Sequence, residues 1–126
     1  MIAVDTNVLV RLIVHDDPRQ AATAKSFIGG AAWVSVLSLT EAIWVLETVY
    51  RLTSKELAKV IEMLLSHQDL VLQDSDAVEG ALELFSAKPS LGFSDCLMLE
   101  LARKGGHLPM GTFDRSLAKV KGARQL

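Results

Sequence analysis

The sequence has little of several residues and patterns that mark common classes of protein. Its single cysteine, Cys96, excludes a disulfide framework and suits a reducing compartment. Three scattered histidines, His15, His67 and His107, give no zinc-ligand spacing with that one cysteine. No apolar run approaches the roughly 20 residues that span a membrane, and neither a GxGxxG nor a P-loop pattern occurs. Disulfide-rich, zinc-binding, membrane and common nucleotide-binding proteins are therefore disfavoured.

The chain is long enough for one domain with a core and too short for two ordinary domains. It has 126 residues, of which 50% are hydrophobic. Asp5 comes too early to leave room for the basic segment and apolar core of a secretory signal. We therefore expect a single domain over residues 1–126 and a cytoplasmic location.

Charge is distributed unevenly along the chain. The formal net charge of −2 does not indicate a nucleic-acid binder. Residues 103–126, however, hold six basic side chains against one acid, whereas the first 102 residues hold seven basic and 14 acidic ones. This asymmetry would suit a phosphodiester substrate if a basic strip lies beside an acidic pocket. The counts alone favour the simpler interpretation, a solvated C-terminal face.

Short apolar runs alternate with helical patterns from one end of the chain to the other. The expected strands are 2–4, 32–36, 70–72 and 107–111, with 123–126 as a candidate fifth. Helical spacing predicts helices over 8–14, 18–28, 39–49, 54–65, 75–87 and 93–104, and a short one through 117–120. This alternation predicts a three-layer α/β/α sandwich with a central parallel sheet of four or five strands.

Two segments fit the capping-box pattern of a helix start. They are Ser38–Glu41 and Thr53–Glu56, each with a hydroxyl residue followed three positions later by a glutamate. The apolar positions of the first of these helices, through Val49, are expected to face the sheet. Asp95 shares a helix face with apolar residues at positions 98, 99 and 102, and we expect it to point inward.

Four acids fall at comparable positions in this pattern. Asp5 follows the first strand, Glu41 lies in the first turn of the helix after the second strand, Asp95 opens a helix, and Asp114 follows the fourth strand. Each of them can act as a helix cap or favour a positive helix end. Four acids at one edge of a small sheet would repel one another, and a divalent cation such as Mg²⁺ or Mn²⁺ would relieve that repulsion.

An ordered set of four motifs resembles a known family. The sequence is similar to the PIN-domain ribonucleases, most closely the VapC-type toxins of toxin–antitoxin modules, over essentially its whole length. The motifs are Asp5-Thr6-Asn7-Val8-Leu9, Glu41 with Val45-Leu46, Phe93-Ser94-Asp95, and Thr112-Phe113-Asp114-Arg115.

This resemblance implies a metal-dependent endoribonuclease with a catalytic site of Asp5, Glu41, Asp95 and Asp114. Asp5 and Asp95 would be the principal ligands of Mg²⁺ (or Mn²⁺), and Glu41 and Asp114 would complete the metal shell and orient or deprotonate the attacking water. Three further groups would hold these carboxylates in place, namely Asn7, Ser94 and Thr112. The likeness also implies an RNA substrate, a cognate antitoxin and a homodimer.

Other interpretations stay open on the sequence alone. The chain could be a non-catalytic α/β binding module, or an aspartyl-phosphate phosphotransferase, which would want a second acid where Asn7 stands. Trp44 lies off the apolar face of its helix. It is either an exposed interface anchor or buried under the next helix, and burial is the favoured expectation.

Overall fold

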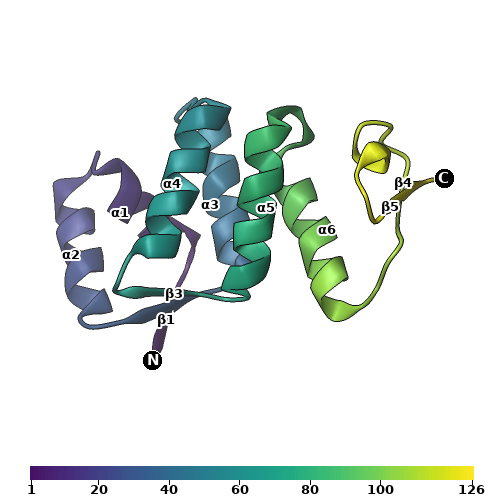
Figure 1. The fold of residues 1–126 in the computed structure, drawn as a ribbon. Coiled ribbons are helices and arrows are strands. Elements are labelled where there is room, and N and C mark those ends of the chain that lie inside the picture. The colour runs from purple at the N-terminus through teal and green to yellow at the C-terminus, as the bar shows by residue number, and fades with distance from the viewer. The chain divides into compact units, whose positions relative to one another are not determined.

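The computed structural model describes residues 1–126 and divides them into two compact units, residues 1–75 and residues 76–126. The first unit contains three strands and four helices, and the second contains the remaining helices and two strands (Figure 1). Every helix is too short or too polar to cross a lipid bilayer.

The sheet of the first unit consists of three short parallel strands in the order β1-β2-β3. They are β1 (Ile2–Val4), β2 (Ala32–Val34) and β3 (Leu70–Leu72). Val4 pairs with Val34, and Val34 with Leu72, so the carboxyl ends of the three strands are level. Residues that follow β1 and β2 therefore lie at the same edge of this sheet.

Four helices complete the first unit, and their ends follow the capping residues in the sequence. They are α1 (Thr6–Val14), α2 (Pro18–Ile28), α3 (Val36–Thr48) and α4 (Ser54–Ser66). Asp5 caps α1 and Asp17 caps α2, each by accepting a hydrogen bond from a backbone N–H three residues on. The expected capping box of Thr53 and Glu56 is confirmed at the start of α4.

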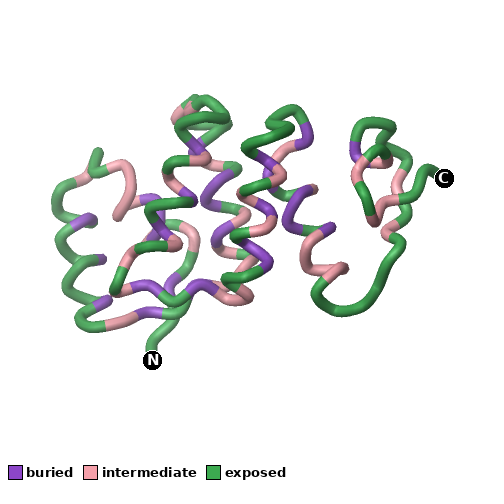
Figure 2. Tube along the Cα trace, in the orientation of Figure 1, coloured by how far each residue is buried: buried purple, intermediate pink, exposed green.

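The core of the first unit is built from the apolar faces that helical spacing predicts. α1 packs against α2 and α3, and β3 packs against α4. Buried positions recur along the inner faces of α3 and α4 (Figure 2). Among the fully buried side chains are Leu9, Leu39, Leu46, Leu57, Ile61 and Leu64.

The second unit is formed by two helices followed by a small sheet. Helix α5 (Ser75–Ala87), which starts at the unit boundary, is joined to α6 (Phe93–Gly105) by the 3₁₀ turn η1 (Pro89–Leu91). Phe85 and Phe93 meet edge to face, with ring centroids 6.0 Å apart. Strands β4 (Met110–Thr112) and β5 (Ala123–Gln125) are parallel and flank the 3₁₀ turn η2 (Leu117–Lys119).

Several expected boundaries are wrong by a few residues. The second strand ends at Val34, because Ser35 accepts a hydrogen bond from the N–H of Ser38 and starts α3 three residues early. Ser38–Glu41 is therefore not a capping box. Val49, expected on the buried face, is exposed because it follows the last helical residue, Thr48.

The expected strands also differ in length and surroundings. The fourth strand begins at Met110, so Pro109 precedes it, and the expected last helix is only the 3₁₀ turn η2. In β1 only Val4 is buried, although the sequence predicts a buried strand. The α/β class is confirmed, but the parallel strands form sheets of three and two, and a central sheet of four or five is not shown.

Candidate active site

Asp5 lies directly after β1, and its two carboxylate oxygens have different surroundings. Oδ1 accepts a hydrogen bond from the backbone N–H of Val8 at 3.1 Å, so the expected helix cap is present. Oδ2 makes no hydrogen bond within the protein, and the side chain is exposed. A cap and a ligand are therefore compatible at this residue, since one oxygen stays available.

Glu41 is held beside the start of α1 by a contact that spans 35 residues of sequence. The hydroxyl of Thr6 donates a hydrogen bond to Glu41 Oε2 at 2.6 Å. This distance is short for a hydroxyl–carboxylate hydrogen bond. Because Thr6 follows Asp5, the structure brings Asp5 and Glu41 to the same region of the first unit.

Asp95 and Asp114 form a corresponding pair in the second unit. Asp95 lies in the first turn of α6 and is half-buried. Burial raises the pKa of its carboxyl, and the negative charge of Asp114 raises it further. The expectation that Asp95 points inward holds only in part, because Met98 on the same face is exposed.

Asp114 is fixed by the turn that follows β4. Its Oδ1 accepts hydrogen bonds from the backbone N–H groups of Ser116 at 2.8 Å and Leu117 at 3.0 Å. Its own N–H donates to the hydroxyl oxygen of Thr112 at 3.0 Å. Thr112 thus positions the backbone of Asp114, whereas Asn7 and Ser94 are exposed and make no hydrogen bond to any of the four carboxylates.

The donor chemistry of both pairs suits a hard divalent cation, which prefers carboxylate and water oxygens. Neither unit by itself contains a group of three or more His, Cys, Asp and Glu side chains arranged to hold a metal ion. Each unit instead contributes one pair of the expected acids.

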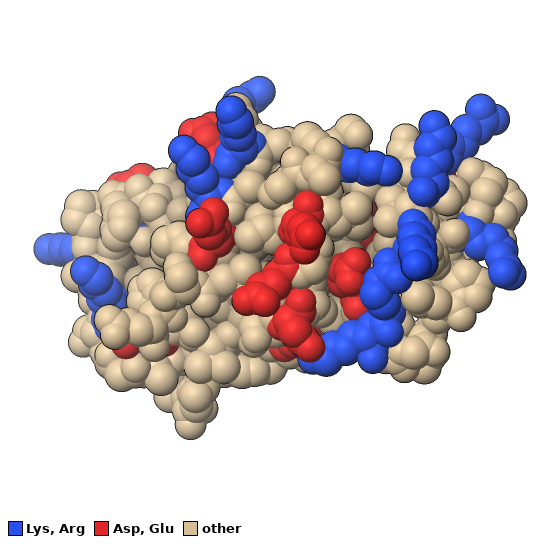
Figure 3. Space-filling view, viewed as in Figure 1, with Lys and Arg blue, Asp and Glu red and all other residues tan.

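Basic side chains gather over α6 and the segment after it (Figure 3). Two of them have structural partners: Arg103 donates to the carbonyl oxygen of Lys121 at 2.6 Å, and Lys104 pairs with Asp76 at 2.7 Å. The side chains of Arg115 and Lys119 form no ion pair. These two cations are therefore available to a phosphate group.

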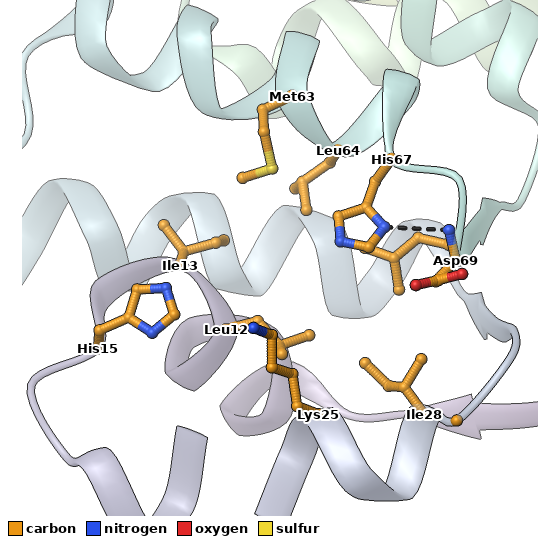
Figure 4. A pocket seen from close by; sticks show the side chains of 11 residues that line it. Leu12, Ile13, His15, Lys25, Ile28, Met63, Leu64, His67 and Asp69 are labelled. Atoms are coloured by element: carbon orange, nitrogen blue, oxygen red, sulfur yellow. Dashed lines mark hydrogen bonds between the residues drawn. The ribbon is translucent and has the colours of Figure 1, made fainter. Parts of the chain in front are cut away.

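A cavity of about 330 Å³ in the first unit contains none of the four acids. His15, Lys25 and His67 line it among apolar side chains from α1, α2 and α4, and the N–H of Asp69 donates to His67 Nδ1 at 3.1 Å (Figure 4). This cavity offers no metal grouping and lies apart from the pair of acids in its unit.

Sequence reasoning missed the roles of two residues in this geometry, and Thr6 was considered only as a helix cap, which is the role of Asp5. Thr6 orients Glu41, and Ser35 rather than Ser38 starts the helix that carries Glu41. Ser35 is recognisable as a hydroxyl residue directly after an apolar strand. Thr6 had no local signal, because its partner is 35 positions away.

The structure is that of an α/β protein with acids after its strands and at its helix starts, and comparison with known families identifies its family. The sequence model of the PIN domain matches residues 2–123, so the chain belongs to the PIN domain family. PIN domains are generally nucleases, hydrolases that act on RNA and use divalent metals. A comparison with individual curated proteins found no significant match.

Proposed function

We propose that this PIN domain is a metal-dependent endoribonuclease in which Asp5, Glu41, Asp95 and Asp114 form one acidic site. The observation that carries this proposal is the environment of the Asp95 carboxyl group. It accepts no hydrogen bond from the protein, and both burial and the charge of Asp114 raise its pKa. Two carboxylates in such surroundings gain most from a bound cation, because the cation removes their repulsion.

One site requires that the two pairs of acids meet. The PIN match over residues 2–123 includes both units and supports one domain over residues 1–126.

The four acids would divide the work as follows. Asp5 and Asp95 would hold Mg²⁺ or Mn²⁺, which when bound lowers the pKa of water and neutralises charge on the scissile phosphate. Glu41 and Asp114 would orient the attacking water and accept its proton. Thr6 donates to Glu41 Oε2 and keeps Oε1 free to face the water. Three residues would support the carboxylates, namely Asn7, Ser94 and Thr112.

More specifically, we propose that the protein is a VapC-type toxin that acts in the cytoplasm, forms a homodimer and is inhibited by a cognate antitoxin. The outer face of α3 supports a protein partner, because Trp44 is 63% exposed and not buried as the sequence suggested. Leu37 and Val49, on the same helix or at its end, are also exposed. Large exposed apolar groups of this kind anchor protein interfaces.

The decisive experiment is cleavage of total cellular RNA by antitoxin-free protein with Mg²⁺ or Mn²⁺, with EDTA, and with Asp5→Asn. Asparagine caps helices as well as aspartate does, so this variant keeps α1 and removes only the charged ligand. Asp17→Asn is the matched control, because Asp17 caps α2 with the same geometry outside the proposed site.

Discrete fragments that need both metal and Asp5 support the nuclease proposal. Loss of cleavage with Asp17→Asn would instead indicate that changing a helix cap is enough to abolish activity. No cleavage by folded wild-type protein under any condition would favour a non-catalytic binding module. An acid-stable label of Asp5 by a phosphate donor would favour the phosphotransferase.

A further inference from the structure

A hollow of about 420 Å³ runs between α1 and α2 and is continuous with the proposed active site, because Asp5 itself lines it. The α1 side is formed by Asn7, Val8 and Arg11. The α2 side is formed by Gln20, Thr23, Ala24 and Phe27. This volume is within the range of small-ligand pockets and too small to admit a nucleic-acid duplex.

Phe27 gives the hollow a flat apolar wall. Its side chain is 57% exposed, although single exposed aromatic residues are common and need no explanation by themselves. Phe27 differs from those because its ring, with Val8 and Ala24, lines a cavity that reaches a candidate metal ligand. A planar ring stacked on it would cover this apolar surface.

The polar wall of the hollow presents hydrogen-bond donors. Arg11 Nε donates to Gln20 Oε1 at 2.6 Å, which fixes the carboxamide of Gln20 and leaves its NH₂ group without a partner. Asn7 also has a side chain without a hydrogen bond in the protein. The hollow therefore offers donors to acceptor atoms along one edge of a ligand, and the side-chain oxygens of Asn7 and Asp5 can accept from it.

Arg11 does not make the hollow a phosphate site. Its guanidinium pairs with Asp16 at 2.6 Å and also donates to the hydroxyl of Tyr50 at 3.3 Å. With this charge neutralised, the hollow offers an apolar plane, uncharged donors and the carboxylate of Asp5, which match a nucleobase and not an anion.

We propose that this hollow holds an unpaired nucleobase of the RNA next to the scissile phosphate, stacked on Phe27 with its acceptor edge on Gln20. This inference rests on the proposed function, since it makes Asp5 the point where the bound strand meets the reacting site. Single-stranded RNA is recognised through such stacking, because bases outside a duplex expose their faces to aromatic side chains. The hollow would thus select single-stranded RNA.

The test is a binding experiment in EDTA, in which no metal-dependent cleavage occurs. Two fluorescein-labelled oligoribonucleotides of the same length are titrated with protein, one of mixed unstructured sequence and one in which every base is replaced by an abasic ribose. Wild-type protein should bind the first more tightly. Phe27→Ala should lose roughly 5- to 100-fold in affinity for the first and little for the second, as expected for one stacked base.

Two further variants show whether the loss comes from the ring. Phe27→Tyr keeps the aromatic face and should bind as wild-type protein does. Met63→Ala is the matched control, because Met63 is an exposed apolar residue of the same unit and lines the other cavity. Equal affinity of the wild type for both RNAs, or an equal loss on both with Phe27→Ala, would overturn the proposal.

Cleavage assays separate this proposal from the nuclease assignment. Base-dependent binding that needs Phe27, together with no cleavage in Mg²⁺, would preserve the base site and refute the nuclease. Metal-dependent cleavage with unchanged kcat/KM and unchanged binding in Phe27→Ala would preserve the nuclease and refute the base site.

Discussion

The two pairs of acids differ in their hydrogen bonding and burial. In the first unit the carboxylates receive hydrogen bonds, Asp5 from the N–H of Val8 and Glu41 from the hydroxyl of Thr6. In the second unit Asp95 receives none, is half-buried and faces the charge of Asp114. Both carboxylates of the first pair are therefore positioned by hydrogen bonds, whereas in the second pair only Asp114 is, and Asp95 is left with a repulsion that a cation would relieve.

The largest expected effects come from removing one acid of each pair. Asp95→Asn and Glu41→Gln should both abolish metal-dependent RNA cleavage if the four acids form one site. Their stabilities should differ, because Asp95→Asn removes a repulsion whereas Glu41→Gln weakens the bond from Thr6. Urea unfolding should therefore give a free energy for Asp95→Asn equal to or above that of wild-type protein. A marked decrease in the free energy of unfolding of Asp95→Asn would contradict the proposed difference between the two pairs.

The rate at which a thiol reagent modifies Cys96 should report on how often the interior of the second unit opens. It is fully buried, and burial with the nearby charges of Asp95 and Glu100 raises its pKa from 9.0 to about 11. The thiolate fraction near pH 8 is therefore roughly 100-fold below that of a thiol at the ordinary value. Ellman's reagent should react with folded protein at least that much more slowly than with unfolded protein. Equal rates would mean that the second unit opens freely.

Thr6→Val should remove only the hydrogen bond that positions Glu41 in the first pair. Valine keeps the shape of threonine but cannot donate to Glu41 Oε2. Loss of such an orienting bond typically lowers activity by about 10- to 100-fold, and we expect kcat to fall while KM changes little. Thr6→Ser restores the hydroxyl and should restore the rate. An unchanged kcat in Thr6→Val would show that Glu41 needs no positioning.

The unpaired cations of the second unit should contribute to RNA affinity. Arg115→Gln and Lys119→Gln should each weaken binding by a few-fold and reduce the salt dependence by about 0.7 per lost phosphate contact. Arg103→Gln is the comparison, because Arg103 is occupied by Glu100 and the carbonyl oxygen of Lys121. We expect that variant to lose stability instead. Identical salt slopes for all three proteins would refute the distinction.

The smallest effect concerns the capping box of α4 in the first unit. Thr53→Ala should lower the free energy of unfolding by about 1 kcal/mol, as for other helix caps. Hydrogen bonds from Thr53 lower the pKa of Glu56 below its ordinary value of 4.5, so its stabilising effect is present above that pH and is lost as the pH falls through the lowered pKa. Urea titrations at neutral and acidic pH should show the difference from wild-type protein shrinking in acid.

Much of the local structure was predictable because its causes lie within a few residues. The Thr53–Glu56 box, the glycines that end α2 and α6, and the apolar faces of α3 and α4 all follow from short-range spacing. Errors fell where two local signals competed. Ser35 and Ser38 could each start α3, and the hydroxyl nearer the strand end formed the cap.

The sequence by itself determined the α/β class, the order of the elements and the four acids at strand ends and helix starts. The tertiary structure alone decided what surrounds each acid, because those contacts join residues far apart in the chain. Thr6 reaches Glu41 across 35 positions, the charge of Asp114 acts on Asp95, and Trp44 is exposed to solvent. Spacing fixes where a side chain enters the fold, and packing fixes which groups it meets there.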